Sequence, residues 1–154
     1  MRRAGALLAV LALLPCACSP TPPSGRGLKH DVLDDAIARA IGDPYTCVLL
    51  ADRATKRVVY RYGEASTCGA ILPACDRPTT MTAQDALPLA ETPGGRTTSC
   101  ASNPEGTRAV AWAEGRVPSK TRALIYSARM EGDHTLPGRE VALRLEEALA
   151  NAGV

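Results

Sequence analysis

The stretch TRAVAWAEGRVPSKTRALIYSARMEGDHTLPGREVALRLEEALANA, residues Thr107 to Ala152, decides the fold, because its pattern is that of two apolar strands followed by one amphipathic helix. We expect the first strand over residues 107–114 and the second over residues 121–130, joined by the turn residues Gly115 to Ser119. Both strands carry apolar side chains on both faces. Such strands are typical of the middle of a sheet that is covered on both sides.

A helix is expected after the second strand. Pro137 suits its first turn, where the missing N–H costs nothing. Apolar residues then recur at helical spacing and form one stripe: Val141, Leu145, Ala148, Leu149 and Ala152. Charged residues between them face mostly toward water: Arg139, Arg144, Glu146 and Glu147. The stripe predicts a C-terminal helix that packs on the sheet.

The upstream half supplies the other elements. A helix is expected over residues 31–41, because Leu33, Ile37 and Ile41 recur at helical spacing and Gly42 ends the pattern. Further patterns predict a β-hairpin with strands 45–51 and 57–62, a short helix over 82–90 capped by Thr82 or Thr80, and a short strand over 96–100. The order α-β-β-α-β-β-β-α predicts an α+β domain: a mostly antiparallel five-stranded sheet with the N- and C-terminal helices packed on it.

The N-terminus indicates export. Arg2 and Arg3 precede an apolar run over residues 4–14. This run is too short to span a bilayer of about 30 Å at about 1.5 Å per residue, but it suits a secretory signal peptide. We therefore expect a signal peptide over residues 1–17, a Pro-rich tether over 18–27 and a single domain over 28–154.

The residues Pro15-Cys16-Ala17-Cys18-Ser19 resemble the lipobox of bacterial lipoproteins, in which a small residue precedes the cysteine that becomes acylated. The resemblance implies lipidation at Cys18. Pro15 departs from it, because the family usually has leucine there. In a Gram-negative cell, Ser19 in place of aspartate implies the outer membrane, with the domain facing the periplasm. Ordinary signal-peptidase cleavage nearby, which would give a soluble periplasmic form, and use of Cys16 remain the alternatives.

Four cysteines remain after Cys18: Cys47, Cys68, Cys75 and Cys100. An even number in a small exported domain predicts two disulfide bonds, with three pairings open. We favour Cys68–Cys75 with Cys47–Cys100, because the first pair is close in sequence. No C-x-x-C pair is present after Cys18, and the chain has only two histidines, so the sequence implies no metal site and no redox motif.

The charge of the chain is balanced. Removal of a leader that contains Arg2 and Arg3 leaves 16 basic residues against 16 acidic ones. Overall charge therefore predicts neither a nucleic-acid partner nor attraction to an anionic membrane surface. No phosphate-binding loop is present, and no cofactor is implied. Glu131, Asp133 and His134 form a polar group after the last strand, which we interpret as a solvated loop.

The element order resembles two groups of proteins. One is the profilin-like or roadblock-like group of small sensor and scaffold domains. The other is the penicillin-recognising serine enzymes, the β-lactamases and transpeptidases. Three stretches are similar to motifs of the second group: Ala65-Ser66-Thr67-Cys68-Gly69 to A-S-T-x-K, Arg96-Thr97-Thr98 to K-T-G, and residues 111–118, AWAEGRVP, to A-W-x-x-G-x-x-P.

The second resemblance implies Ser66 as a nucleophile and Arg96 as a substrate-binding residue. Gly69, however, stands where that family has its activating lysine, and a serine without a neighbouring base is a poor nucleophile. We therefore carry three hypotheses: a non-catalytic envelope lipoprotein whose domain binds an envelope protein or cell-wall component, a small-ligand-binding profilin-like module, and a degenerate penicillin-recognising hydrolase. We favour the first.

Overall fold

The computed structural model describes residues 27–154; the expected signal peptide, Cys18 and most of the tether lie outside them. The elements in chain order are α1 (His30–Ile41), β1 (Cys47–Asp52), β2 (Val58–Tyr62), α2 (Ala65–Cys68), β3 (Leu72–Pro73), β4 (Thr80–Met81), α3 (Ala83–Ala86), the 3-10 helix η1 (Leu87–Glu91), β5 (Arg96–Ala101), β6 (Ala109–Arg116), β7 (Leu124–Gly132) and α4 (Gly138–Asn151). None of the helices in residues 27–154 is long and apolar enough to cross a membrane.

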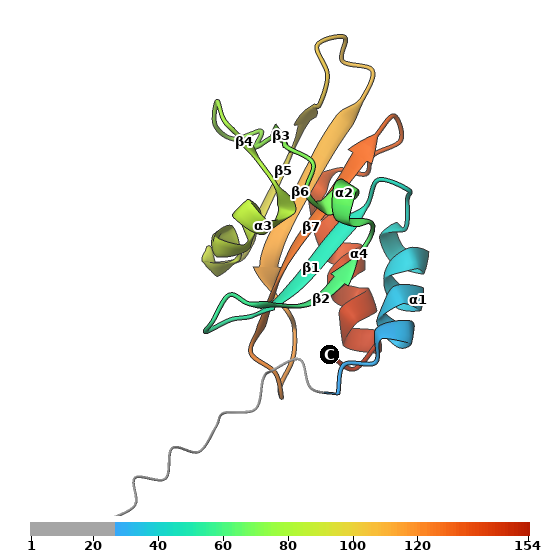
Figure 1. Ribbon diagram of the computed structural model, residues 1–154, viewed down its shortest axis with the longest axis vertical. Coiled ribbons are helices and arrows are strands. Elements are labelled where there is room, and N and C mark those ends of the chain that lie inside the picture. Colours follow the sequence, from blue (N-terminus) through green and yellow to red (C-terminus); the bar gives the residue numbers. More distant parts are fainter. Residues whose placement is uncertain (1–26) are drawn as a thin grey trace, which may run out of the picture.

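Five strands form one antiparallel sheet in the order β2-β1-β7-β6-β5 (Figure 1). The two long strands β6 and β7 lie side by side inside it, with Trp112 paired to Arg129 across the ladder. The expected α+β class and five-stranded antiparallel sheet are thus confirmed. The two apolar strands of the opening stretch occupy interior positions, as their two-sided apolar pattern predicted.

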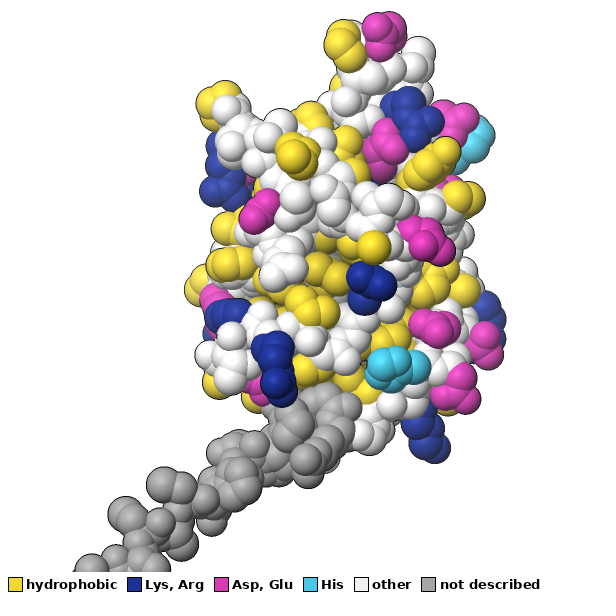
Figure 2. Space-filling view, in the orientation of Figure 1, with side chains coloured by type: hydrophobic (Ala, Val, Ile, Leu, Met, Phe, Trp, Pro, Cys, Tyr) yellow, Lys and Arg dark blue, Asp and Glu magenta, His cyan; other side chains and the backbone are white. Residues whose placement is uncertain are grey.

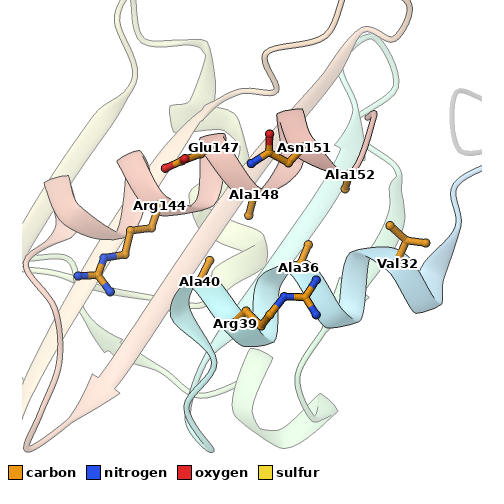
Figure 3. A pocket seen from close by; sticks show the side chains of 9 residues that line it. All are labelled: Val32, Ala36, Arg39, Ala40, Arg144, Glu147, Ala148, Asn151 and Ala152. Carbon is orange, nitrogen blue, oxygen red and sulfur yellow. The ribbon is translucent and has the colours of Figure 1, made fainter.

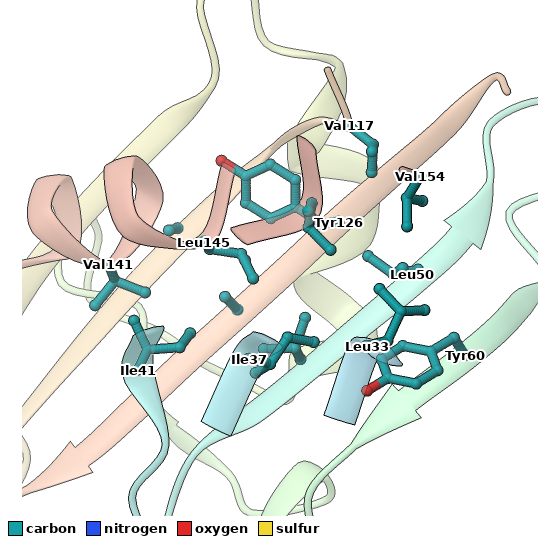
Figure 4. Close-up of a cluster of buried hydrophobic side chains, with 14 of the residues drawn as sticks. Leu33, Ile37, Ile41, Leu50, Tyr60, Val117, Tyr126, Val141, Leu145 and Val154 are labelled. Carbon is teal, nitrogen blue, oxygen red and sulfur yellow. The ribbon is translucent and has the colours of Figure 1, made fainter. Parts of the chain in front are cut away.

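The terminal helices α1 and α4 cover one face of the sheet. Alternate residues point to this face, because successive side chains of a strand lie on opposite sides. Figure 4 shows Leu33 and Ile37 of α1, Leu145 of α4 and Tyr126 of β7 in one cluster, and all four side chains are almost fully buried. The stripes predicted from helical spacing on both helices are therefore the residues that form this core.

A second layer covers the opposite face of the sheet. It consists of α2, α3, η1 and the small β3–β4 hairpin, which cross in front of the strands in Figure 1. The fully buried Trp112 of β6 points into this layer and donates its indole N–H to the carbonyl oxygen of Pro73 at 2.7 Å. This bond fixes β3 over the β6 side of the sheet.

This second layer holds the main differences from the expected elements. Residues 63–80, expected to be irregular, contain α2, β3 and the first residue of β4, and these elements have only two to four residues each. The helix expected over 82–90 divides into α3 and η1, with a proline in the first turn of η1. Thr82 caps α3 as expected, because its side-chain oxygen accepts a hydrogen bond from the backbone N–H of Asp85. The Asp85 carboxylate in turn accepts a hydrogen bond from the backbone N–H of Thr82.

Candidate functional site

Two disulfide bonds tie the second layer to the sheet. Cys47 of β1 is bonded to Cys68 of α2, and Cys75 is bonded to Cys100 of β5. All four cysteines expected to form disulfides do so. The favoured pairing, Cys68–Cys75 with Cys47–Cys100, is wrong.

The course of the chain explains this correction. α2 lies over β1, where Cys47 and Cys68 share an apolar cluster. The following residues carry the chain across the sheet to β3, which lies over Trp112. Cys75 therefore packs with a different cluster, beside Cys100. Nearness in sequence did not predict nearness in space, because Cys68 and Cys75 lie over different strands.

Ser66 and Arg96 lie over opposite halves of the sheet. Ser66 is an exposed residue of the four-residue helix α2, which packs on β1. Arg96 begins β5, the edge strand three positions away from β1. At about 4.8 Å between neighbouring strands, this lateral separation is about 14 Å. The structure does not bring the two residues to a common cleft.

Arg96 belongs instead to an ion-pair network that links the exposed Asp76 to the buried Glu114. Its guanidinium is 2.8 Å from a carboxylate oxygen of Asp76 and 2.8 Å from one of Glu114, and it also donates to the carbonyl oxygen of Ala74 at 2.8 Å. Asp76 and Ala74 belong to the loop after β3, whereas Glu114 lies opposite Arg96 on β6. Arg96 therefore fastens that loop to the sheet.

Glu114 is the most perturbed carboxyl group of this network. Its side chain is fully buried, and burial raises its pKa to about 7 although the Arg96 guanidinium acts in the opposite direction. Its Oε1 atom has no hydrogen-bond partner in the structure. Ser127 Oγ and Arg129 Nε, on the neighbouring strand β7, are likewise buried without a partner.

The sequence interpretation missed these three residues. Glu114 was expected as the last residue of its strand, and Ser127 and Arg129 as parts of a strand that is apolar on both faces. All three point to the face covered by the second layer, together with Trp112. A charged residue at a strand position whose alternate neighbours are apolar is the signal that could have indicated buried polar groups.

The polar group after the last strand is divided between two environments. Glu131 accepts hydrogen bonds from Arg108 and from Ser102, which lowers its pKa. Asp133 and His134 are exposed to solvent, and their side chains approach one another only to 4.0 Å. Within residues 27–154 no three metal-ligating side chains come together.

An open groove runs between α1 and α4 on the outer side of the helical layer. Its volume is about 390 Å³. Figure 3 shows Ala36 and Ala40 of α1 facing Ala148 of α4 across it, and these short side chains keep the groove hollow. Polar side chains stand at its rim: Arg39, Arg144, Glu147 and Asn151. The groove combines an apolar floor with charges of both signs, and none of its lining residues is a serine, cysteine or histidine.

No family model, no curated protein and no solved structure matches this chain in comparisons with known proteins.

Proposed function

We propose that the protein is an exported, lipid-anchored component of the cell envelope, whose domain binds another envelope protein through the α1–α4 groove without catalysing a reaction. The groove with its alanine floor is the observation that carries the binding role. The lipid anchor follows from the resemblance of residues 15–19 to a lipobox.

The two disulfide bonds support export. Disulfides persist in oxidising compartments such as the bacterial periplasm and are rare in the cytosol. Both bonds connect separate parts of the fold, Cys47–Cys68 joining α2 to β1 and Cys75–Cys100 joining the loop after β3 to β5. They are consistent with the location that the N-terminal residues predict.

The form of the groove favours a protein partner over a small molecule. Small-molecule sites enclose most of the ligand surface. This groove is open to solvent, and its floor is built from short side chains that leave room for side chains of a partner. Recognition of a helical or extended segment in such a groove uses apolar anchors along the floor and charged pairs at the rim. Arg39 and Glu147 offer one charge of each sign for those pairs.

Site-specific photo-cross-linking in the native envelope tests this role. A photoreactive residue at Asn151, on the groove rim, should give one discrete adduct with an envelope protein. The same residue at Ala54, in the exposed turn after β1, is the control position and should give none. Ala36→Trp should fill the groove and abolish the Asn151 adduct, because the indole would occupy the space above the alanine floor.

Ala101→Trp is the matched control for that variant, because Ala101 is an exposed residue of the edge strand β5, outside the groove. It should leave the adduct unchanged. Equal cross-linking from Ala54 and Asn151, or an adduct that survives Ala36→Trp in a folded protein, would refute the groove as the binding site.

A further inference from the structure

Basic side chains gather at one end of the sheet, on the β1–β2 turn and the β6–β7 loop. They surround a hollow of about 420 Å³ whose lining includes Arg53, Arg116, Lys120 and Arg122. The hydroxyl-bearing residues Ser119 and Thr121 lie among them. Guanidinium, ammonium and hydroxyl groups are the donors that bind phosphate oxygens. We call these four cations, together with Lys56, the basic end.

The nearby carboxylates do not neutralise the basic end. Glu91 of η1 contacts three of its cations, Arg53 at 3.2 Å, Lys56 at 2.6 Å and Arg116 at 3.3 Å. The lysine and arginine hydrogen bonds hold the pKa of Glu91 at about 2, so it stays ionised. With Asp52, two carboxylates face five cations, which leaves three positive charges. The side chains of Arg53 and Arg116 are 41% and 54% exposed.

The basic end lies where the chain enters the domain. Arg122 donates a hydrogen bond from Nη2 to the carbonyl oxygen of Gly27, the first described residue, at 3.2 Å. In Figure 1 the β1–β2 turn and the β6–β7 loop lie at the lower end of the molecule, beside this point. Figure 2 shows Lys and Arg side chains at the same end. The nine residues from Ser19 to Gly27 can span at most about 30 Å.

We propose that the basic end is a docking surface for anionic phospholipid head groups. The proposal rests on the proposed lipid anchor, because an acyl chain at Cys18 would hold the basic end within one tether length of the bilayer. Each lysine or arginine near an anionic membrane surface contributes favourable binding energy, so the basic end would add to the attachment that the lipid provides. The docking would also orient the α1–α4 groove relative to the membrane.

The balanced total charge does not oppose this docking. Electrostatic attraction to a membrane falls off within a Debye length of about 8–10 Å. The attraction therefore depends on the charges nearest the membrane and not on the total charge of the chain. Five cations gather on the β1–β2 turn and the β6–β7 loop, and this local excess of positive charge does not show in the total charge of the chain.

Vesicle binding by the mature chain carrying Cys18→Ser tests the proposal without an acyl chain. Sedimentation with phosphatidylcholine vesicles containing about 30% phosphatidylglycerol should show binding, and pure phosphatidylcholine vesicles should show none. Arg116→Gln/Lys120→Gln should weaken binding to the anionic vesicles about thirtyfold, and raised salt should abolish it. Arg61→Gln/Arg139→Gln removes the same charge from exposed positions outside the basic end and should leave binding unchanged.

Absence of binding to the anionic vesicles, or equal loss in both double variants, would overturn the proposal. Binding to a soluble polyanion such as heparin, with none to the vesicles, would also overturn it. Thermal melting of both variants shows that they are folded. The assay contains no acyl chain, so absence of vesicle binding would overturn the docking surface without bearing on lipidation at Cys18. Absence of lipidation would likewise not alter the measured vesicle binding.

Discussion

Glu114 shows at the scale of one residue how the second layer alters the chemistry of the sheet. Its buried carboxyl group has a folded pKa of about 7 against an ordinary value of 4.5. As pH rises, the unfolded chain releases this proton first. The contribution of Glu114 to stability is therefore fully present below pH 4.5 and is lost as pH rises through 7. The lowered pKa values of Glu91 and Asp76 affect stability only at lower pH.

Glu114→Gln should remove this pH dependence, because glutamine stays neutral at both ends of the range. As pH rises from 4.5 to 8, the native protein should lose up to about 3 kcal/mol of unfolding free energy that the Glu114→Gln variant keeps. Urea unfolding at both pH values measures the difference. Glu147→Gln, at an exposed position on α4, is the matched control. A constant difference between Glu114→Gln and the native protein across this range would contradict the assignment.

Gly138 shows the limit of sequence patterns at the same scale. It is the first residue of α4, and a Cβ atom there would lie 2.5 Å from the Trp112 carbonyl oxygen and 2.6 Å from that of Thr98. The pattern predicted a helix from about Pro137 but gave no sign that its first turn touches the backbone of two strands. Such a contact depends on how the elements pack.

Gly138→Ala should therefore destabilise the protein by about 2–3 kcal/mol, because α4 must move away from the sheet. Thermal or urea unfolding measures this. Gly94→Asn is the comparison variant, since Gly94 has a φ of +80° and open space around its Cα, and asparagine tolerates that conformation. A loss in Gly138→Ala no larger than that in Gly94→Asn would show that the close approach is not limiting.

Elements were predictable where their hydrophobic period was long. The helices over His30–Ile41 and Gly138–Asn151 and the strands β1, β2, β6 and β7 match their expected positions within a few residues. The ends differ most at β7, which begins at Leu124 instead of residue 121. β6 runs on to Arg116, because Glu114 and Gly115 still pair with β7. The segments α2, β3 and β4 are too short to carry a period, and contacts with the sheet determine them.

Each disulfide bond joins two separate elements of the fold, and the length of the loop that it closes predicts how much it stabilises the protein. The bonded cysteines are 21 and 25 residues apart, so both loops are nearly equal in length. By the chain-entropy account each bond should stabilise the fold by about 3 kcal/mol. Cys47→Ala/Cys68→Ala and Cys75→Ala/Cys100→Ala should lower the unfolding free energy by similar amounts.

The pairing itself is checked by mass spectrometry of unreduced peptides. A Cys68–Cys75 linked peptide would contradict the structure. In the pairing Cys68–Cys75 with Cys47–Cys100, either double variant would break both bonds. A variant with all four cysteines replaced that is no less stable than the two double variants would therefore also contradict the structure.

At the scale of the whole molecule, the expected location in the cell envelope rests on Cys18 and its neighbours, which lie outside the described residues 27–154. Cys18→Ser should move the protein from the membrane fraction to the soluble fraction of the envelope, because acylation needs the thiol. Mass spectrometry of the native protein should find acyl groups on Cys18. The anchor would be refuted by a native protein without acyl groups whose Cys18→Ser variant still fractionates with membranes.

The arrangement of the whole sheet also bears on the hydrolase alternative. Acylation of a serine needs a base in hydrogen-bond reach of its hydroxyl. Ser66 is followed by Gly69 where the resembling family has lysine, and no lysine lies near it in sequence. Arg96 is always protonated and is held by Asp76 and Glu114 about three strands away from α2. We therefore expect no covalent adduct when the protein is incubated with a fluorescent penicillin or a serine-reactive probe and analysed by mass spectrometry. An adduct on Ser66 that is lost in Ser66→Ala would make the enzyme hypothesis the leading one, since a hydroxyl reacts at that site only if another group of the fold takes its proton.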